Sequence, residues 1–374
     1  MARIAIITSQ AFSLINFRGP LIREMVRRGH EVAAIAPDHS ISTEEGLRLL
    51  GAEPINAWIS RAGRNPVSDL YSQIVLTKQV WNIRADHIFT YGMKPVIYGS
   101  IAARICKIPH RTALIEGLGY SFSEETSSLS RSAISFAVRI LLRRTLEHYH
   151  SLFYLNGRDR EDLLELNPSI RESLVHISGI GVDLDEYKAT VPSTAEAMTF
   201  SLFARMVKSK GIGEFVRAAQ LVHSDYPSTR FILIGGPDSN PDSFSSNQLE
   251  EWHNQGVVEW VDHVDDVKPW IEQTSVVVQP SYYREGLSRI LQEAAAMGRA
   301  SITTNWPGCR EAIEDGKTGI LVEPKNVNEL ASAMIKFIER PDMVLEMGAR
   351  ARMLAERKFD ITQINEAILQ EMNL

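Results

Sequence analysis

The sequence predicts an α/β protein made of two doubly wound domains in series. Short apolar runs alternate with segments of helical periodicity in both halves of the chain, a pattern typical of parallel sheets covered by helices on both faces. The alternation stops once, in the aperiodic stretch GVDLDEYKATVPSTAEA, and then restarts. The length of 374 residues also exceeds the usual size of one domain, about 150 residues. We therefore expect domains at 1–183 and 198–360, joined by a linker at 184–197.

The first domain opens with the strand RIAIITS and the helix GPLIREMVRRG. In this helix Leu21, Ile22, Met25 and Val26 recur at helical spacing before Gly29. Five more runs have the length and apolar content of strands: HEVAAIAP, DHIFTY, RTALIE, SLFYLN and LVHISG. The helical segments between them lie at about 67–83, 95–105 and 129–147.

The second domain repeats the pattern. Its predicted strands are MTFSLFA, RFILIGG, VVEWV, SVVVQPS, ASITT and GILVE. Helices are expected from Gly211, near 246–254 and across Glu293. The end of the chain is helical, and its last helix, at about 361–374, is expected to cross back to the first domain.

Composition excludes several classes of protein. The chain has two cysteines and a net charge of -6, which argues against a disulfide framework and against nucleic-acid binding. Residues 1–190 hold 22 Lys and Arg against 20 Asp and Glu, and the remainder holds 18 against 26, so an anionic partner is expected at the first half. The short apolar run at the N-terminus and the lack of a long apolar segment favour a cytoplasmic protein, at most peripheral on a membrane.

The stretch REGLSRILQEAAAMGRA carries two glutamates at a strand-to-helix junction. Gly286 and Leu287 would offer backbone N–H groups at a helix N-terminus, where anions bind, and Ser288 would be the N-cap. Glu285 stands on the loop, and Glu293 lies within the helix, with a side chain that leans back toward the N-terminus. A site and two solvated charges are about equally expected from this context alone.

A second cluster follows the first strand of the second domain. Arg205 comes just after the strand, and Lys210 just before the helix that starts near Gly211. A guanidinium and an ammonium at that edge suit a diphosphate and could stabilise the charge of a leaving nucleotide. Taken alone, the lysines of this loop would more simply be solvated surface charges.

These motifs together resemble the family-4 retaining glycosyltransferases of the GT-B fold, which have two Rossmann-like domains facing a central cleft. The matching segments of the second half are FARMVKSKGI, LIGG, PSYYREGLSRILQEAAAMGRA, TTNWPGCREAIEDGKTGILVEP and SGIGVDLDEY. Those of the first half are FSLINFRGPLIREMVRRGHEVAAIAP, TYGMKPVIYGSIAARICKIP and IEGLGYSFS. The subgroup resembled includes capsule and exopolysaccharide glycosyltransferases and galactosaminyltransferases that act on undecaprenyl-diphosphate-bacillosamine.

The resemblance implies a role for each matching residue. Glu285 would contact hydroxyls of the donor sugar, Glu293 would hold the ribose, and Arg205 and Lys210 would bind the diphosphate beside the backbone of Gly286 and Leu287. In the first domain, the segment Asn16–Phe17–Arg18–Gly19 matches the loop near the donor phosphate and acceptor. The loop facing donor sugar and acceptor would contain Gly117, Leu118 and Gly119.

Two positions depart from the family pattern. Ser288 stands where a proline is common, and Glu116 stands where many members have a histidine facing the donor sugar. We therefore assign no general base from this loop and keep Glu116 as a candidate acceptor contact.

The implied activity is that of a retaining hexosyltransferase. It would move a sugar, an N-acetylhexosamine or a hexose, from a UDP-sugar to a polyprenyl-diphosphate-linked saccharide during assembly of a surface polysaccharide or glycan. The alternatives are a GT-B UDP-sugar epimerase and a non-catalytic nucleotide-sugar-binding protein.

No cofactor and no metal are expected. Asp183 and Asp185 form an Asp-x-Asp pair, but the pair falls in the linker, where a structural turn is the better interpretation. The histidines have no metal-binding spacing, and TSQAFS after the first strand lacks the glycines of a dehydrogenase fingerprint.

The segment LSRSAISFAVRILLRRTLEHYH is apolar, helical and basic. Its basic residues are Arg131, Arg139, Arg143 and Arg144, and no acid precedes Glu147. A helix of this kind at 129–147 either packs into the core of the first domain or lies on an anionic membrane, and the two roles are compatible on different faces.

Overall fold

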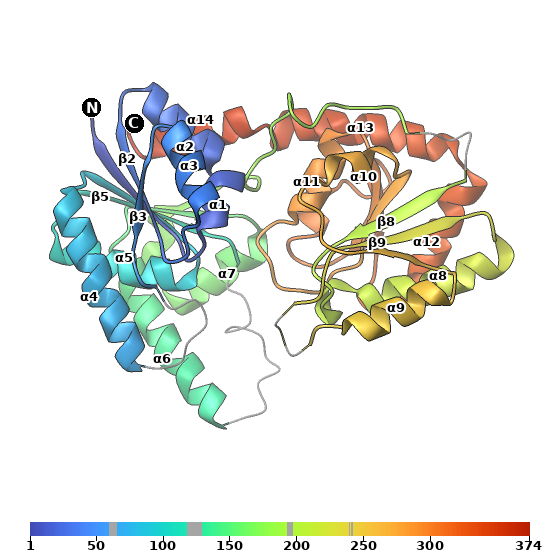
Figure 1. Cartoon of the computed structure of the whole chain (residues 1–374), viewed down its shortest axis with the longest axis horizontal. Helices are drawn as coiled ribbons and strands as arrows, with labels where there is room; N and C mark the ends of the chain where they lie inside the picture. Colours follow the sequence, from blue (N-terminus) through green and yellow to red (C-terminus); the bar gives the residue numbers. More distant parts are fainter. Residues whose placement is uncertain (60–65, 118–128, 193–196, 239, 241) are drawn as a thin grey trace. The chain divides into compact units, whose positions relative to one another are not determined.

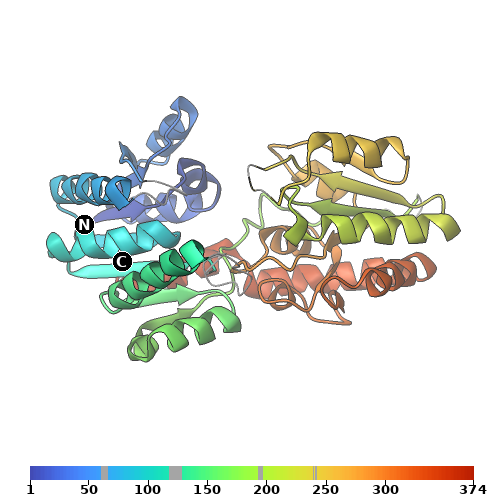
Figure 2. The same cartoon turned by 90° about the horizontal axis from the view of Figure 1, so that it is seen from below.

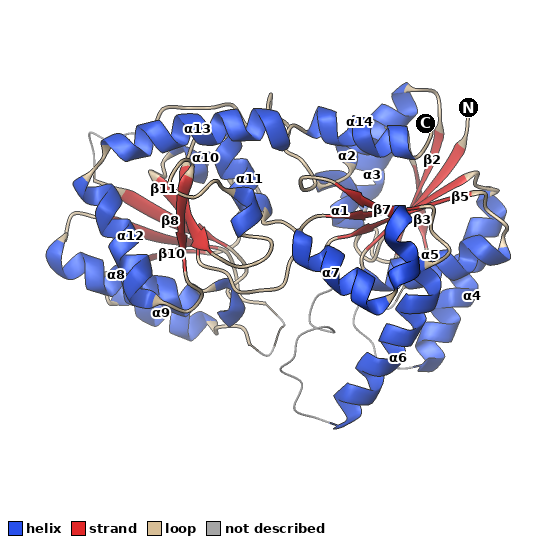
Figure 3. Ribbon diagram, turned by 180° about the vertical axis from the view of Figure 1, so that it is seen from behind, coloured by secondary structure: helices blue, strands red, loops and turns tan. Residues whose placement is uncertain are grey.

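The computed structural model describes residues 1–59, 66–117, 129–192, 197–238, 240 and 242–374. The chain divides into two compact units. Unit 1 comprises Met1–Ile177 with Thr362–Leu374, and unit 2 comprises Ser178–Ile361. Each unit is a parallel sheet with helices around it (Figure 3), which confirms the predicted fold class.

Unit 1 contains a seven-stranded parallel sheet in the order β3-β2-β1-β4-β5-β6-β7. Its strands are β1 (Arg3–Ile7), β2 (Glu31–Ala36), β3 (Glu53–Asn56), β4 (His87–Tyr91), β5 (His110–Ile115), β6 (Ser151–Tyr154) and β7 (Leu174–His176). Its helices are α1 (Ala11–Asn16), α2 (Gly19–Arg27), α3 (Ile41–Leu49), α4 (Pro66–Ile83), α5 (Met93–Ile105), α6 (Leu129–Leu146), α7 (Gly157–Leu166) and α14 (Ile361–Glu371), with a 3-10 turn at Pro168–Ser173.

One face of this sheet is covered by α4, α5 and α6, which lie below the strands in Figure 1 and side by side in Figure 2. Their buried residues join those of β1, β4 and β5 in one apolar cluster. The last helix, α14, packs with unit 1, where its residues bond to Arg28 just past the end of α2 and to β6. Arg28 pairs with Glu366, and Ser151 Oγ donates to Glu371 at 2.8 Å.

Unit 2 contains a six-stranded parallel sheet in the order β10-β9-β8-β11-β12-β13. Its strands are β8 (Thr199–Phe203), β9 (Arg230–Ile234), β10 (Glu259–Val261), β11 (Val276–Gln279), β12 (Ala300–Thr304) and β13 (Gly319–Val322). Its helices are α8 (Ile212–Asp225), α9 (Ser246–Asn254), α10 (Lys268–Glu272), α11 (Arg289–Ala296), α12 (Val327–Glu339) and α13 (Asp342–Lys358), with 3-10 turns η3 (Lys208–Lys210) and η4 (Arg310–Ala312).

The stretch between the two sheets packs on unit 2. The buried guanidinium of Arg299 donates to the Thr190 carbonyl at 2.6 Å, and Arg352 donates to the Tyr187 carbonyl at 3.0 Å. The segment 184–197, which the sequence marks as a linker, therefore falls within unit 2.

Candidate functional site

The predicted donor residues gather at the carboxyl edge of the unit 2 sheet, where doubly wound folds bind ligands. Strands β8 and β11 are neighbours in this sheet. The loop after β8 carries Arg205 and Lys210, and the loop after β11 carries Glu285. Strand order therefore brings together residues that are 75 positions apart in the chain.

Lys210 and Glu285 form an ion pair, with 2.7 Å between Nζ and Oε2. The lysine side chain is 11% exposed and the glutamate side chain 21%. The ammonium also lies 5.3 Å from the ring centroid of Tyr283. A partly buried pair of this kind holds both charges in a fixed geometry before any ligand arrives.

The turn that carries Lys210 requires a glycine after it. Gly211 has a φ of 77°, and a Cβ there would lie 2.2 Å from the Pro280 carbonyl oxygen. The close approach is reinforced by the Tyr282 N–H, which donates to the Ser209 carbonyl at 2.9 Å. The backbones of the loops after β8 and β11 are therefore in direct contact, and this contact places Lys210 beside Glu285.

A second glycine supports Glu285 from the loop after β12. Gly308 has a φ of 88°, and a Cβ there would lie 2.5 Å from the Glu285 carbonyl oxygen. The Ser288 N–H donates to the Gly308 carbonyl at 2.8 Å. Sequence reasoning did not single out Gly308 as a site residue. The sequence feature that could have pointed to Gly308 is the turn-forming Trp306–Pro307–Gly308 stretch just after a buried strand.

Gly286, Leu287 and Ser288 lie at the N-terminus of α11, where the sequence predicted a helix to begin, and all three are buried. Ser288 occupies the N-cap position, but its side chain makes no capping hydrogen bond. Its backbone N–H donates instead to the Gly308 carbonyl. The helix end still presents its positive dipole toward the carboxyl edge of the sheet, near Lys210 and Glu285.

Glu293 is buried, and it has partners of its own. Its Oε1 accepts from Arg289 Nε at 2.6 Å and from the Tyr187 hydroxyl at 3.0 Å. Burial raises the pKa of Tyr187, so the phenol stays protonated and acts as a donor. Tyr187 was missed because it lies in the stretch interpreted as a linker, 106 residues before Glu293.

Arg205 lies past the end of β8 and pairs with Asp238, at 2.8 Å from Nη1 to Oδ2. Its side chain is 51% exposed. Within the described residues, Arg205 and Lys210 thus have different carboxylate partners at the same edge of the sheet. An incoming diphosphate would compete with these carboxylates for the two cations.

Cys309 lies in the same loop as Gly308 and is fully buried. Burial raises the pKa of its thiol to about 12. The thiol is therefore neutral near neutral pH and is unsuited to serve as a nucleophile.

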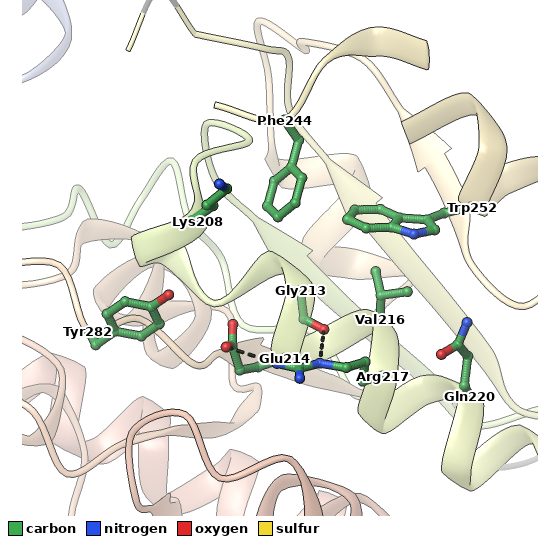
Figure 4. Close-up of a pocket in the computed structure, with 9 residues that line it drawn as sticks. All are labelled: Lys208, Gly213, Glu214, Val216, Arg217, Gln220, Phe244, Trp252 and Tyr282. Atoms are coloured by element: carbon green, nitrogen blue, oxygen red, sulfur yellow. Dashed lines mark hydrogen bonds and ion pairs between the residues drawn. The ribbon is translucent and has the colours of Figure 1, made fainter. Parts of the chain in front are cut away.

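Next to this edge, a pocket of about 390 Å³ opens on the outer side of α8 (Figure 4). Figure 4 shows the rings of Phe244 and Trp252 on one side and Glu214 and Arg217 on the other, with Lys208 and Tyr282 toward one end. The pocket shares only the Lys208–Lys210 turn and the loop after β11 with the predicted donor residues. Arg205, Lys210, Glu285 and Glu293 do not line it.

In unit 1, Arg18 and Glu116 form an ion pair at 2.5 Å. Arg18 is 1% exposed, and its guanidinium carbon lies 4.9 Å from the ring centroid of Tyr91. Burial raises the pKa of Tyr91 to about 12, and the Tyr91 hydroxyl lies 2.9 Å from Ser13 Oγ. The neighbouring strands β4 and β5 therefore end in one polar network, which the sequence did not reveal.

The other predicted residues of unit 1 flank this network. Gly19 is buried as the first residue of α2, and Gly117 has a φ of 103° just after Glu116. Asn16 and Phe17 close α1. Leu118 and Gly119 lie outside the described residues.

Within the described residues, no group of three or more His, Cys, Asp or Glu side chains could hold a metal ion. No helix in the described part of the chain is both long enough and apolar enough to cross a membrane. Asp183, the first acid of the Asp-x-Asp pair, accepts from the backbone N–H groups of Asp185 and Glu186 at 3.0 and 3.2 Å, as in a structural turn.

Comparison with known proteins gives a consistent result. Residues 197–340 match the family model described as glycosyl transferases group 1. The chain is 27% identical over 387 residues to the N,N'-diacetylbacillosaminyl-diphospho-undecaprenol alpha-1,3-N-acetylgalactosaminyltransferase of Campylobacter jejuni, covering 100% of this chain and 97% of that enzyme. It is 29% identical over 155 residues to the capsular polysaccharide biosynthesis glycosyltransferase CapM of Staphylococcus aureus, covering 41% and 40% of the two chains.

Solved structures share the fold over the whole chain. Anabaena Alr3699/HepE in complex with UDP superposes with a TM-score of 0.77 at 17% identity, covering 100% of both chains. Sucrose-phosphate synthase from Thermosynechococcus elongatus superposes with a TM-score of 0.79 at 17% identity, covering 99% and 98%.

Proposed function

We propose that this chain, which has the GT-B fold and whose residues 197–340 match the glycosyl transferases group 1 model, is a glycosyltransferase. It would move a sugar from a UDP-sugar to a saccharide carried on a polyprenyl diphosphate. The observation that carries the donor site is the Lys210–Glu285 ion pair beside the N-terminus of α11. UDP is the proposed nucleotide because a protein of the same fold, HepE, was solved in complex with UDP.

The acceptor is proposed from the relative that matches along the whole chain. That enzyme is named for transfer of N-acetylgalactosamine to a saccharide on diphospho-undecaprenol. An acceptor of the same class, a sugar on a polyprenyl diphosphate, would bind in unit 1 near Glu116, whose carboxylate is anchored by Arg18. The donor sugar would be an N-acetylhexosamine or a hexose.

We propose that transfer retains the anomeric configuration through a front-face displacement. The acceptor hydroxyl attacks the anomeric carbon on the side from which the diphosphate leaves, and its proton passes to the departing phosphate oxygen. Lys210 and Arg205 stabilise the charge that develops on the leaving group. Glu285 binds donor-sugar hydroxyls and Glu293 the ribose, so neither glutamate acts as a nucleophile.

We propose that the reaction needs no metal, because Arg205, Lys210 and the N-terminus of α11 would together offset the charge of the diphosphate. Turnover should therefore be unchanged after treatment with EDTA. Loss of turnover that added Mg²⁺ or Mn²⁺ restores would contradict the scheme.

We also propose peripheral contact with the cytoplasmic face of the membrane, where a lipid-linked acceptor would be presented. In the described part of α6, Leu142 and Leu146 are buried in the unit 1 core, and Arg143 and Arg144 are exposed. The helix is thus suited both to core packing and to contact with an anionic surface.

A panel of UDP- and GDP-sugars, assayed with and without a lipid-diphosphate-linked saccharide, tests this function. The expected result is acceptor-dependent release of UDP and a product whose anomeric configuration by NMR equals that of the donor. Conversion of the donor to another UDP-sugar without acceptor would instead indicate an epimerase. Donor binding with no turnover on any acceptor would indicate a nucleotide-sugar-binding protein.

A further inference from the structure

Helix α4 exposes a stripe of large apolar side chains. The stripe recurs at helical spacing along one face of the helix, and its members are between 58% and 74% exposed: Val67, Leu70, Tyr71, Ile74 and Trp81. The same face carries a single charged residue, Lys78. Such an apolar surface in water is the usual mark of a binding site for another surface.

The opposite face of α4 is also apolar. Leu76 and Val80 are fully buried in the cluster that α4 shares with α5, α6 and the sheet. A helix that is apolar on both faces is normally covered on both. The inner face of α4 is covered by unit 1 itself, whereas the outer face is exposed.

The outer face of α6 lies on the same side of the sheet. Figures 1 and 2 show α5 between α4 and α6 in one layer, and the buried faces of all three helices turn toward one cluster. The outer faces of α4 and α6 therefore both point away from the sheet. The described part of α6 exposes Arg139, Arg143 and Arg144, together with Ile140 and Leu141 at 41% and 46%.

We propose that the outer faces of α4 and α6 form one membrane-binding surface for a bilayer with anionic headgroups. The α4 stripe enters the interfacial region, and the α6 arginines lie against the headgroups. Tyr71 and Trp81 suit this depth because their rings are amphipathic. Lys78 can extend its ammonium to the headgroups while its methylene chain stays among the apolar side chains.

The charges of the surface favour a bilayer over a second copy of the chain. Among the described side chains, the outer faces of α4 and α6 carry Lys78 and three arginines and no acidic residue, and Glu147, exposed just past the end of α6, still leaves the surface net basic. A two-fold contact would bring each basic face against its own copy and leave Arg143 and Arg144 facing like charges. An anionic lipid surface supplies those charges and also accepts the apolar stripe.

This inference extends the proposed function, because a lipid-linked acceptor places the reaction at a membrane. It also assigns the main membrane contact to α4 rather than to α6. The sequence suggested 129–147 as the membrane element, whereas the structure adds α4, which among the described side chains exposes five large apolar residues against two on α6.

Vesicle flotation tests the surface without donor or acceptor, so its result is independent of the activity. Vesicles of phosphatidylcholine, with and without phosphatidylglycerol, would be mixed with the full chain. The double variant Leu70→Ser/Ile74→Ser should bind anionic vesicles more weakly by on the order of a hundredfold, since each leucine-sized side chain buried in the interface contributes about tenfold. Arg143→Gln/Arg144→Gln should lose about fivefold per arginine, and only on anionic vesicles.

A matched control exchanges two exposed leucines elsewhere, Leu49 on α3 and Leu221 on α8, which are 89% and 50% exposed. The Leu49→Ser/Leu221→Ser variant should float like the wild type. Brominated lipid quenches the fluorescence of tryptophans that enter the bilayer, which gives a direct readout. The extent of quenching should be smaller in the Trp81→Phe variant than in the wild type.

Two outcomes would overturn the inference. One is wild-type flotation of the Leu70→Ser/Ile74→Ser variant on anionic vesicles. The other is a wild-type dimer, seen by sedimentation, that becomes a monomer in this variant, which would assign the stripe to a second copy.

Turnover gives a further test. If the inference holds, the Leu70→Ser/Ile74→Ser variant should turn over a short-chain, water-soluble acceptor at the wild-type rate while losing turnover on acceptor embedded in vesicles. Loss on both acceptors with full vesicle binding would contradict the link between this surface and acceptor access.

Discussion

The Lys210 ammonium and the Glu285 carboxylate meet at 2.7 Å, although they come from the loops after two different strands. The contact depends on β8 and β11 being neighbours and on Gly211, which allows the two loops to touch. In the proposed scheme, the pair supplies a fixed cation for the diphosphate and a fixed anion for the sugar hydroxyls.

This pair can be tested by a double-mutant cycle. Lys210→Met and Glu285→Gln should each lower the free energy of unfolding by about 1–3 kcal/mol, because each leaves a partly buried group without its partner. The double variant should recover part of that loss, with a coupling of about 1 kcal/mol or more, while turnover stays low in all three. If the double variant regains turnover along with stability, the role of the pair is structural only.

Arg205→Ala should lower kcat by on the order of a hundredfold or more, because it removes a cation from the developing leaving-group charge. Arg217→Ala is the matched control. Each arginine pairs with a carboxylate of its own, Asp238 for Arg205 and Glu214 for Arg217, and the two side chains are 51% and 60% exposed. Steady-state kinetics on purified protein provides the measurement, and near-normal kcat in Arg205→Ala would exclude the leaving-group role.

Glu293→Ala should weaken UDP binding by about tenfold or more, through loss of a hydrogen bond to a charged group. Calorimetry with UDP and with 2′,3′-dideoxy-UDP, which lacks the two ribose hydroxyls, tests whether Glu293 contacts those hydroxyls. The wild type should prefer UDP, and Glu293→Ala should bind both ligands with similar affinity. Tyr187→Phe, which removes one hydrogen bond to Glu293, should give a smaller change of the same sign. A full preference for UDP in Glu293→Ala would remove this residue from the ribose site.

Glu116→Gln should raise the KM for the acceptor by about tenfold, because an amide accepts a hydroxyl less strongly than a carboxylate does. The KM for the donor should stay the same. Glu53→Gln, at an exposed position at the start of β3, serves as the control. Arg18→Lys keeps the charge but loses the guanidinium geometry, so it should shift the acceptor KM in the same direction. An unchanged acceptor KM in both Glu116→Gln and Arg18→Lys would exclude this acceptor contact.

The alternation of apolar runs and helical segments was sufficient to predict two parallel-sheet domains, and several elements follow it closely. The helix expected near 246–254 is α9 at Ser246–Asn254, and the helix expected at 129–147 is α6 at Leu129–Leu146. Short elements such as α1 and β3 were not predicted, because a few residues give too little periodicity.

The sequence by itself determined which loops carry the proposed donor residues, because Arg205, Lys210, Glu285 and Gly286 each follow a buried strand. Only the tertiary structure decided which side chains meet. Glu293 bonds to Arg289 and to Tyr187, which lies 106 positions before it, and Arg18 meets Glu116 across 98 positions. The α4 stripe likewise needed the structure. Periodicity shows which residues share a face of one helix, but the packing of other elements decides whether that face is covered.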